Sequence, residues 1–262
     1  MQYNNEMEDL EEETEQTVII AGRNPVMEAI RSGREIESVH IQMGEHKGPL
    51  GKILAMAKER GIPVKDATSE KLASMSGVPS HQGVAAVLSA AAYSTMDDIR
   101  KRANGAPLFV ILADGVEDPH NLGALIRTAE AAGAHGIIIP KRHSAGLTAT
   151  AAKAAAGAVF HLPIVRVSNL VSTMEELKEE GVWFYCADMD GQSWCKVDYK
   201  GGVGLVIGSE GSGVSRLIKE KCDFVVSLPM CGEINSLNAS VAGSILMYEV
   251  TRQRLGLAAK NN

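Results

Sequence analysis

The uninterrupted apolar run LFVILAD at residues 108–114 constrains the fold of this chain most strongly. A strand that faces water on one side alternates apolar and polar residues, whereas this run predicts a strand buried on both faces. Similar runs, separated by segments of helical length, recur at HGIIIP, HLPIVRV, VWFYCAD, VGLVIG and FVVSLP. This alternation predicts a doubly wound α/β domain with a parallel sheet, which we place at residues 107–262.

A smaller α/β pattern precedes it between residues 17 and 91, where TVIIAG, ESVHIQM, IPVKDA and GVAAVLSA alternate with helical segments. In the first of these helices we expect Asn24 to be the cap and Pro25 to occupy the first turn. Residues 92–106 have the composition of a linker that contains one short polar helix. The sequence therefore predicts two domains of the same class.

The net charge of −6 comes from the start of the chain, because residues 1–16 hold seven acidic and no basic side chains. We expect this segment to be a disordered tail. Without it, 26 bases face 25 acids. That balance neither requires nor excludes RNA, since a local basic patch suffices for phosphate contact.

Other sequence features limit the function classes. No apolar run approaches the roughly 20 residues needed to span a bilayer, and the acidic start does not resemble a signal peptide. The four cysteines form no CxxC pair, and the histidines form no HxxxH, so we expect free thiols, no bound metal and a cytoplasmic location. A nicotinamide-dependent enzyme should carry GxGxxG after its first strand, and this chain does not.

The segment DGVEDPHNLGALIRTAEAAG at 114–133 begins where a strand ends, which is the ligand edge of a parallel sheet. We expect Asn121 to cap the helix. Arg127 lies inside the helix among small residues, from which a guanidinium could reach a phosphate or a polarised oxygen. The alternative is a solvated arginine paired with Glu130.

The segment LVIGSEGSGVSRL at 205–217 runs from a strand through three glycines into a helix. Glycines allow a backbone to approach a ligand closely, but the spacing matches neither GxGxxG nor a P-loop. Packing in an apolar core does not explain a charged side chain such as Glu210 between these glycines. It is either a functional carboxylate or an acid favoured at a helix start.

In SLPMCGEINSLNAS at 227–240, four small polar residues crowd the start of the last helix: Asn235, Ser236, Asn238 and Ser240. Ser236 or Asn238 could simply cap that helix. One cap needs one such residue, so the surplus favours a ligand-binding loop.

In order and spacing, these three segments resemble the motifs of the SpoU (TrmH-type) RNA 2′-O-ribose methyltransferases of the SPOUT superfamily, over residues 107–257. GRNPVMEAI and SHQGVAA resemble the small RNA-binding domain, similar to ribosomal protein L30e, of the ribosomal subgroup. That subgroup is typified by the enzyme that methylates a guanosine in 23S rRNA. Two small departures are Ala239, where valine is commoner, and the local variant Met230-Cys231.

The resemblance implies a SPOUT-type parallel sheet with a C-terminal trefoil knot, a rare exception to unknotted chains. It also implies S-adenosylmethionine as the methyl donor, a homodimer with a shared active site, and packing of the last helix in the core and the dimer interface. The implied catalytic residues are Arg127, Glu210, Asn238 and Asn121, and the implied donor-binding residues are Gly208, Leu228, Leu237, Ile207, Ser236 and Ala239. In the first domain, the polar residues at the ends of elements are either RNA-binding residues or turn residues, namely Arg23, Asn24, His81 and Gln82.

A ribose 2′-hydroxyl must lose its proton as it attacks, so the site needs alignment and a group that favours a developing alkoxide. We expect Arg127 to supply that charge, positioned by Glu210 and Asn238. A guanidinium is too weak a base to take the proton, so the proton acceptor stays open. A tRNA 2′-O-methyltransferase and a non-catalytic RNA-binding factor of ribosome assembly remain alternatives.

Overall fold

The computed structural model describes residues 18–33, 35–44, 48–88, 93–233 and 236–257. The acidic segment 1–16 and Asn235, which the sequence singled out, lie outside these ranges. The chain divides into two compact units, of which one ends before Tyr93 and the other begins at Tyr93, with residues 147–149 grouped with the first.

The first unit contains a four-stranded sheet in the order β1-β4-β2-β3. Strand β4 is antiparallel to β1 and β2, while β2 and β3 are parallel. Its elements are β1 (Val18–Ala21), α2 (Arg23–Arg31), β2 (Ile36–Gln42), α3 (Pro49–Glu59), β3 (Val64–Ala67), α4 (Ser69–Ser76) and β4 (Val84–Leu88). The predicted α/β alternation is confirmed for this unit.

Helix α2 begins earlier than the sequence suggested, so the prediction that Asn24 caps it is wrong. The residue before the helix is Gly22, whose φ of 108° favours glycine, and Asn24 lies exposed in the first turn. Instead of a local cap, the side-chain Oε1 of Gln82 accepts the N–H of Arg23 at 3.0 Å. A residue distant in sequence thus satisfies one of the free N–H groups that begin the helix.

The second unit contains a six-stranded sheet in the order β10-β8-β9-β5-β6-β7. Every pair of neighbours is parallel, as the apolar runs predicted. The strands are β5 (Phe109–Ala113), β6 (Gly136–Pro140), β7 (Ile164–Val167), β8 (Val182–Ser193), β9 (Gly202–Ile207) and β10 (Phe224–Ser227). All five residues of β5 are buried, consistent with a central strand covered on both faces.

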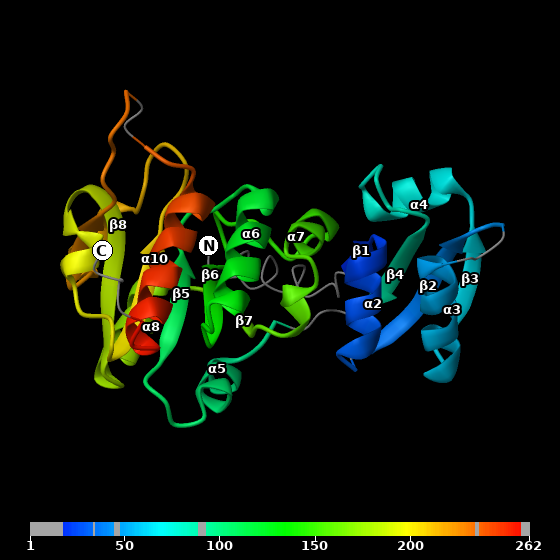
Figure 1. The fold of residues 1–262 in the computed structure, drawn as a ribbon, viewed down its shortest axis with the longest axis horizontal. Coiled ribbons are helices and arrows are strands. Elements are labelled where there is room, and N and C mark those ends of the chain that lie inside the picture. The colour runs from blue at the N-terminus through cyan, green and yellow to red at the C-terminus, as the bar shows by residue number, and fades with distance from the viewer. Residues whose placement is uncertain (1–17, 34, 45–47, 89–92, 234–235, 258–262) are drawn as a thin grey trace, which may run out of the picture. The chain divides into compact units, whose positions relative to one another are not determined.

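The helices of this unit are α5 (Met96–Ala103), α6 (Pro119–Ala131), α7 (Ala149–Ala154), α8 (Leu170–Glu179), α9 (Arg216–Lys221) and α10 (Ala239–Arg254), with 3₁₀ turns η1 (Ala158–Phe160) and η2 (Trp194–Lys196). Helices α6 and α10 lie side by side (Figure 1). A Cβ added to Gly243 would lie 2.8 Å from Leu125, so this glycine allows α10 to approach α6 closely. Ser244 donates to the hydroxyl of Thr128 at 2.9 Å across the same contact.

The strand order places a switch point between β5 and β9. From β5 the chain builds outward through β6 to β7, whereas β9, β8 and β10 lie on the other side of β5. Ala113 pairs with Ile207, so β5 and β9 end at the same level. Asp114 then accepts the N–H of Ser215 at 2.7 Å, which ties together the two loops that follow these strands. Crevices outside such switch points are the usual ligand sites of open α/β sheets.

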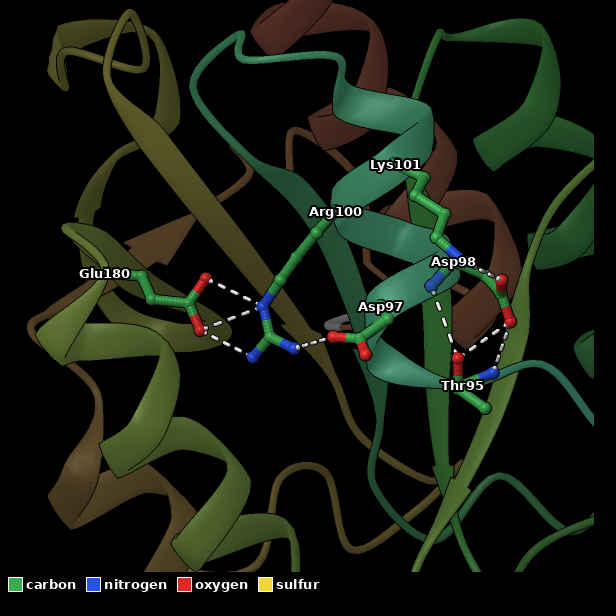
Figure 2. Close-up of polar contacts among 6 residues, drawn as sticks. All are labelled: Thr95, Asp97, Asp98, Arg100, Lys101 and Glu180. Atoms are coloured by element: carbon green, nitrogen blue, oxygen red, sulfur yellow. Dashed lines mark hydrogen bonds and ion pairs between the residues drawn. The ribbon is translucent and has the colours of Figure 1, made fainter.

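Residues 93–103 pack as part of the second unit, which differs from the predicted linker at 92–106. Ile99 is fully buried in the core of this unit. Arg100 donates to the carboxylate of Glu180 through Nε at 3.1 Å and Nη2 at 2.6 Å (Figure 2). The same guanidinium donates to Asp97 at 2.8 Å. The predicted short helix is confirmed, but one apolar residue and a bidentate ion pair hold it in place.

A reciprocal capping box begins α5 (Figure 2). The N–H of Asp98 donates to Oγ1 of Thr95 at 3.3 Å, and the N–H of Thr95 donates to Oδ2 of Asp98 at 2.8 Å. The backbone N–H and the hydroxyl of Thr95 both donate to the Asp98 carboxylate, which lowers the pKa of this carboxyl below its ordinary value. Local hydrogen bonding therefore explains why such a polar segment forms a helix.

Within the described ranges, no helix has both the length and the apolar character that a membrane span requires.

Candidate active site

A single amide, that of Asn238, joins the three sequence motifs. Its Nδ2 donates to Oδ1 of Asn121 at 2.9 Å and also to Oε1 of Glu210. Its Oδ1 accepts the backbone N–H groups of Ser240 and Val241 at 3.0 and 3.2 Å, which caps α10. The cap and the ligand-loop interpretations of this residue are therefore compatible, because the amide oxygen caps α10 while the amide nitrogen bonds to the other two motifs.

Asn121 is free to bond across the fold because another residue caps α6. The sequence predicted Asn121 as the cap, and this prediction is wrong. Oδ1 of Asp118 accepts the N–H of His120 at 3.0 Å, and Pro119 occupies the first helical turn. Asn121 then lies inside the helix, only 5% exposed, with its side chain bonded to Asn238.

Glu210 lies in a tight turn after β9, and not at the start of a helix as one alternative proposed. Ser209 and Gly213 exchange backbone hydrogen bonds of 3.0 and 3.1 Å around it, and α9 begins only at Arg216. The φ values of Gly211 and Gly213, 93° and 68°, favour glycine at both positions. The turn thus presents Glu210 toward Asn238 by backbone geometry.

A cavity of about 490 Å³ lies beside this turn. Its volume falls within the roughly 300–1,000 Å³ typical of small-molecule sites. The six residues expected to bind the donor all line it, namely Ile207, Gly208, Leu228, Ser236, Leu237 and Ala239. Glu210 and Asn238 line it as well.

The lining of this cavity carries negative charge. Asp188 and Glu210 line it, and none of its described lining residues is basic. Nζ of Lys219 bonds to Oδ2 of Asp188 at 2.7 Å, and this bond lowers the pKa of the Asp188 carboxyl. Asp188 was not among the expected site residues, although it follows directly after the buried run VWFYCA, as the polar residues of the other motifs follow their strands.

A second cavity, of about 460 Å³, adjoins the first. It is lined by Gly115, Val116, Glu117, Asp118, Asn121, Ser209, Glu210, Ser212 and Ala239, four of which also line the first cavity. Glu210 lines both cavities, Asn238 lines the first and Asn121 the second. The hydrogen-bonded cluster of these three residues therefore lies where two ligands could meet.

Arg127 is the expected catalytic residue that the structure does not bring to this cluster. It follows Asn121 by six residues, which is about 9 Å along the helix and a different face. Its side chain is exposed, and no described residue forms a hydrogen bond or ion pair with it. Neither the alternative pairing with Glu130 nor the expected positioning by Glu210 and Asn238 is present within the chain.

In the first unit, two of the expected RNA-binding residues lie together. Nε of Arg23 donates to the carbonyl oxygen of Gln82 at 3.2 Å, in addition to the backbone bond described above, and Asn24 lies exposed next to Arg23. The fourth residue, His81, does not belong to this surface. It is buried, its Nδ1 accepts the N–H of Gly83 at 3.0 Å, and its Nε2 bonds to Ser69 at 3.2 Å. Its ring stabilises the turn and has no free nitrogen for RNA.

In the part of the chain that the structure describes, no three His, Cys, Asp or Glu side chains gather closely enough to hold a metal ion.

Two family models match this chain, and they divide it at nearly the same place as the two compact units do. Residues 108–248 match the family model described as the SpoU rRNA Methylase family. The chain belongs to this family. Residues 19–94 match a second family model, described as RNA 2′-O ribose methyltransferase substrate binding. Each match lies almost entirely within one of the two compact units.

Curated relatives share the family over nearly their full length. The chain is 46% identical over 239 residues to the Putative TrmH family tRNA/rRNA methyltransferase YacO of Bacillus subtilis (strain 168), covering 90% of this chain and 95% of that protein. It is 47% identical over 245 residues to a Putative TrmH family tRNA/rRNA methyltransferase of Staphylococcus haemolyticus (strain JCSC1435), covering 90% and 96% respectively.

Solved structures of the SpoU family have the same fold. The SpoU methyltransferase AviRb from Streptomyces viridochromogenes, in complex with the cofactor AdoMet, is 25% identical with a TM-score of 0.77, covering 91% of this chain and 90% of that one. The AdoMet-bound rRNA methyltransferase from Sinorhizobium meliloti is 25% identical with a TM-score of 0.74, covering 93% and 89%. The A. aeolicus TrmH/SpoU tRNA modifying enzyme is 28% identical with a TM-score of 0.52, covering 62% and 84%.

SpoU methyltransferases use S-adenosylmethionine, and the first cavity fits this donor. Gly208 offers bare backbone at its lining, and the carboxylate of Glu210 favours a cationic sulfonium. When bound there, the donor supplies an electrophilic methyl group and a neutral thioether leaving group. Ile207, Leu228 and Leu237 would hold it on the apolar side.

Substituting Asn238→Asp tests the two functions of the amide separately, because it keeps the acceptor oxygen and removes the donor nitrogen. The cap is retained, because an aspartate oxygen also accepts the N–H groups that begin α10. The other end loses its donor and faces Glu210 with like charge, which we expect to cost on the order of 1 kcal/mol in stability and to lower methyl transfer. The reciprocal double variant Asn238→Asp with Glu210→Gln restores a donor and an acceptor. Thermal unfolding and initial rates should both recover in the double variant, and additive losses would show that this bond has no such role.

Proposed function

We propose that this chain transfers a methyl group from S-adenosylmethionine to the ribose 2′-hydroxyl of a guanosine in 23S rRNA, as a homodimer in the cytoplasm. The observation that carries the proposal is the Asn238 amide, which joins Asn121 and Glu210 between two adjoining cavities. One cavity suits the donor, and the other suits the ribose that accepts the methyl group.

The chain's own residues would act by alignment and charge. Asn238, held by Glu210 and Asn121, fixes the loop between the cavities, so that the hydroxyl approaches the methyl group along one line. Arg127 would stabilise the negative charge that develops on the 2′-oxygen as its proton leaves. Its guanidinium stays protonated, so the proton goes to another acceptor, which this proposal leaves open.

The position of Arg127 supports a shared active site. Its exposed guanidinium has no polar partner among the described residues and lies away from the cluster of its own chain, so Arg127 of a second copy would complete each site. Helix α10 offers a surface for that copy, because Val241, Ile245 and Tyr248 share one face and are 48%, 36% and 53% exposed. Burying such an apolar stripe stabilises a dimer.

The domain roles are part of the same proposal. Residues 17–91 would form an L30e-like domain that binds RNA through the surface of Arg23, Asn24 and Gln82. Residues 107–262 would form the catalytic domain, whose C-terminal segment passes through a trefoil knot. The adjoining loops after β9 and β10, together with the return of α10 to pack against α6 and β9, support a knotted path.

Two observations favour ribosomal RNA over tRNA as the substrate. The neighbour named an rRNA methyltransferase covers 93% of this chain, whereas the neighbour named a tRNA modifying enzyme covers 62%. The rRNA methyltransferase covers so much of this chain that its match must include most of the first unit, which matches a substrate-binding family model. A tRNA ribose remains the alternative substrate.

Methyl transfer from labelled S-adenosylmethionine to purified 23S rRNA and to tRNA, followed by nucleoside analysis, tests this function. We expect 2′-O-methylguanosine from 23S rRNA alone. Label in tRNA would establish the alternative substrate. Calorimetric titration with the donor separates an enzyme from a non-catalytic RNA-binding factor, because the factor has no need to bind the donor. No binding and no transfer would contradict the proposal.

A further inference from the structure

Two arginines in the described ranges differ from all the others. Each of the others bonds to a carboxylate or to a carbonyl oxygen of the chain. Arg127 and Arg142 are exposed and make no hydrogen bond or ion pair with any described residue. Arg127 already has an expected role in methyl transfer, whereas Arg142 has none.

Arg142 lies on a turn whose backbone is held firmly at both ends. The turn follows β6, where Lys141 donates its N–H to Val167 at 2.9 Å and its carbonyl oxygen accepts Nη2 of Arg166 at 2.9 Å. At the other end, the N–H of Ala145 donates to the carbonyl oxygen of Val116 at 2.8 Å. The side chain of Arg142 is therefore presented on a fixed frame.

The hydrogen bond from Ala145 to Val116 places the turn beside the second cavity. Val116 and its neighbour Glu117 both line that cavity. Nδ1 of His143 also lies 3.8 Å from Oε1 of Glu117, so the side chains of the turn and of the cavity lining come close to each other. Lys141 and Arg142 are exposed on this same turn.

The cavity itself cannot neutralise an RNA strand. Its lining includes Glu117, Asp118 and Glu210, and no described lining residue is basic. A ribose that enters it brings a phosphate on each side, and each phosphate carries a negative charge. Such a strand needs cations at the rim, and unpaired arginines suit phosphate because their planar fork donates two parallel hydrogen bonds.

We propose that Arg142, together with Lys141, binds a backbone phosphate of the RNA strand next to the ribose that is methylated. This inference rests on the proposed function and adds a positioning site that holds the strand at the mouth of the second cavity. Phosphate contacts fix register without reading sequence, so these residues contribute equally to the binding of any RNA that enters the site.

Substituting Arg142→Ala, alone and with Lys141→Ala, tests the contact. The probes are the 23S rRNA transcript for kinetics and a fluorescein-labelled single-stranded RNA for binding. We expect KM for RNA to rise about tenfold in the single variant, while kcat at saturating RNA and the donor affinity stay close to wild type. The plot of log K for RNA binding against log salt concentration has a negative slope, and its magnitude should decrease by about 0.7 for each phosphate that the variant no longer binds.

Lys101→Ala is the matched control, because Lys101 is 78% exposed on α5, which precedes β5 and lies away from the ends of the strands that build the site. Arg142→Lys should keep part of the affinity for RNA that Arg142→Ala loses, since lysine keeps the positive charge but cannot donate the two parallel hydrogen bonds of a guanidinium. If wild type methylates RNA while Arg142→Ala keeps its KM and salt slope, the inference is overturned and the proposed function stands. If wild type transfers no methyl group, the proposed function fails, and the salt slope still decides the phosphate contact.

Discussion

Arg127→Ala is expected to abolish methyl transfer while leaving the affinity for S-adenosylmethionine nearly unchanged. Removing a charge that stabilises a developing oxyanion typically costs on the order of 10²–10³ in rate, and the missing guanidinium also loosens alignment. Arg127 does not line the donor cavity, and its exposed side chain has no polar partner among the described residues. Initial rates and calorimetric titration with the donor measure the two effects separately.

A mixed dimer provides the control for this prediction. Arg127→Ala and Asn238→Ala each damage a different part of the site. If Arg127 acts on the site of the partner copy, a heterodimer of the two variants contains one intact site and regains up to half of the wild-type activity. Wild-type rates in Arg127→Ala alone would show that this arginine has no role in the chemistry. No recovery in the heterodimer would place Arg127 in the site of its own chain.

Gly208→Ala should remove donor binding, because the turn after β9 has no room for a side chain. A Cβ at Gly208 would lie 2.1 Å from the carbonyl carbon of Gly213 and 2.2 Å from the backbone nitrogen of Val214. Both obstacles are backbone atoms, so the whole turn must move, and Glu210 moves with it. We expect a loss of donor affinity of at least about 100-fold, and a loss of stability of about 1–3 kcal/mol from overpacking.

Gly232→Ala is the control for this substitution, since a Cβ there meets no atom of the described residues within 4 Å. Both variants add one methyl group to a glycine near the same loops, so they differ only in the space available. Calorimetric titration and thermal unfolding should show wild-type behaviour for Gly232→Ala. Wild-type donor affinity in Gly208→Ala would mean that this turn does not form the donor site.

The positions of the helices and strands could be predicted because the hydrophobic pattern determines them. The run at 108–114 gave the central strand β5, and the similar runs gave its parallel neighbours, since burial on both faces removes polar alternation. Hydrogen-bond partners were harder to predict. Asp118 and Asn121 are both good caps and lie three residues apart, and only the structure shows that Asp118 caps and Asn121 reaches Asn238.

The remaining differences between expectation and structure have a common physical origin in contacts between distant segments. The capping of α2 by Gln82 and the burial of His81 depend on a turn that lies 59 residues from Arg23 in the sequence. The bidentate bond from Arg100 to Glu180 converts an expected linker into packed structure across 80 residues. Local propensity contains no information about such contacts. The separation of Arg127 from the cluster of Asn121, Glu210 and Asn238 is a further feature that local propensity does not reveal.

Mapping of ribose methylation in 23S rRNA and tRNA, from cells with and without the gene, tests the central claim most directly. Our account predicts the loss of one 2′-O-methyl group, on a guanosine of 23S rRNA, with every other site unchanged. Restoring the wild-type gene should return that methyl group, and restoring the Arg127→Ala variant should not. If no ribose in either RNA loses its methyl group, the account is contradicted.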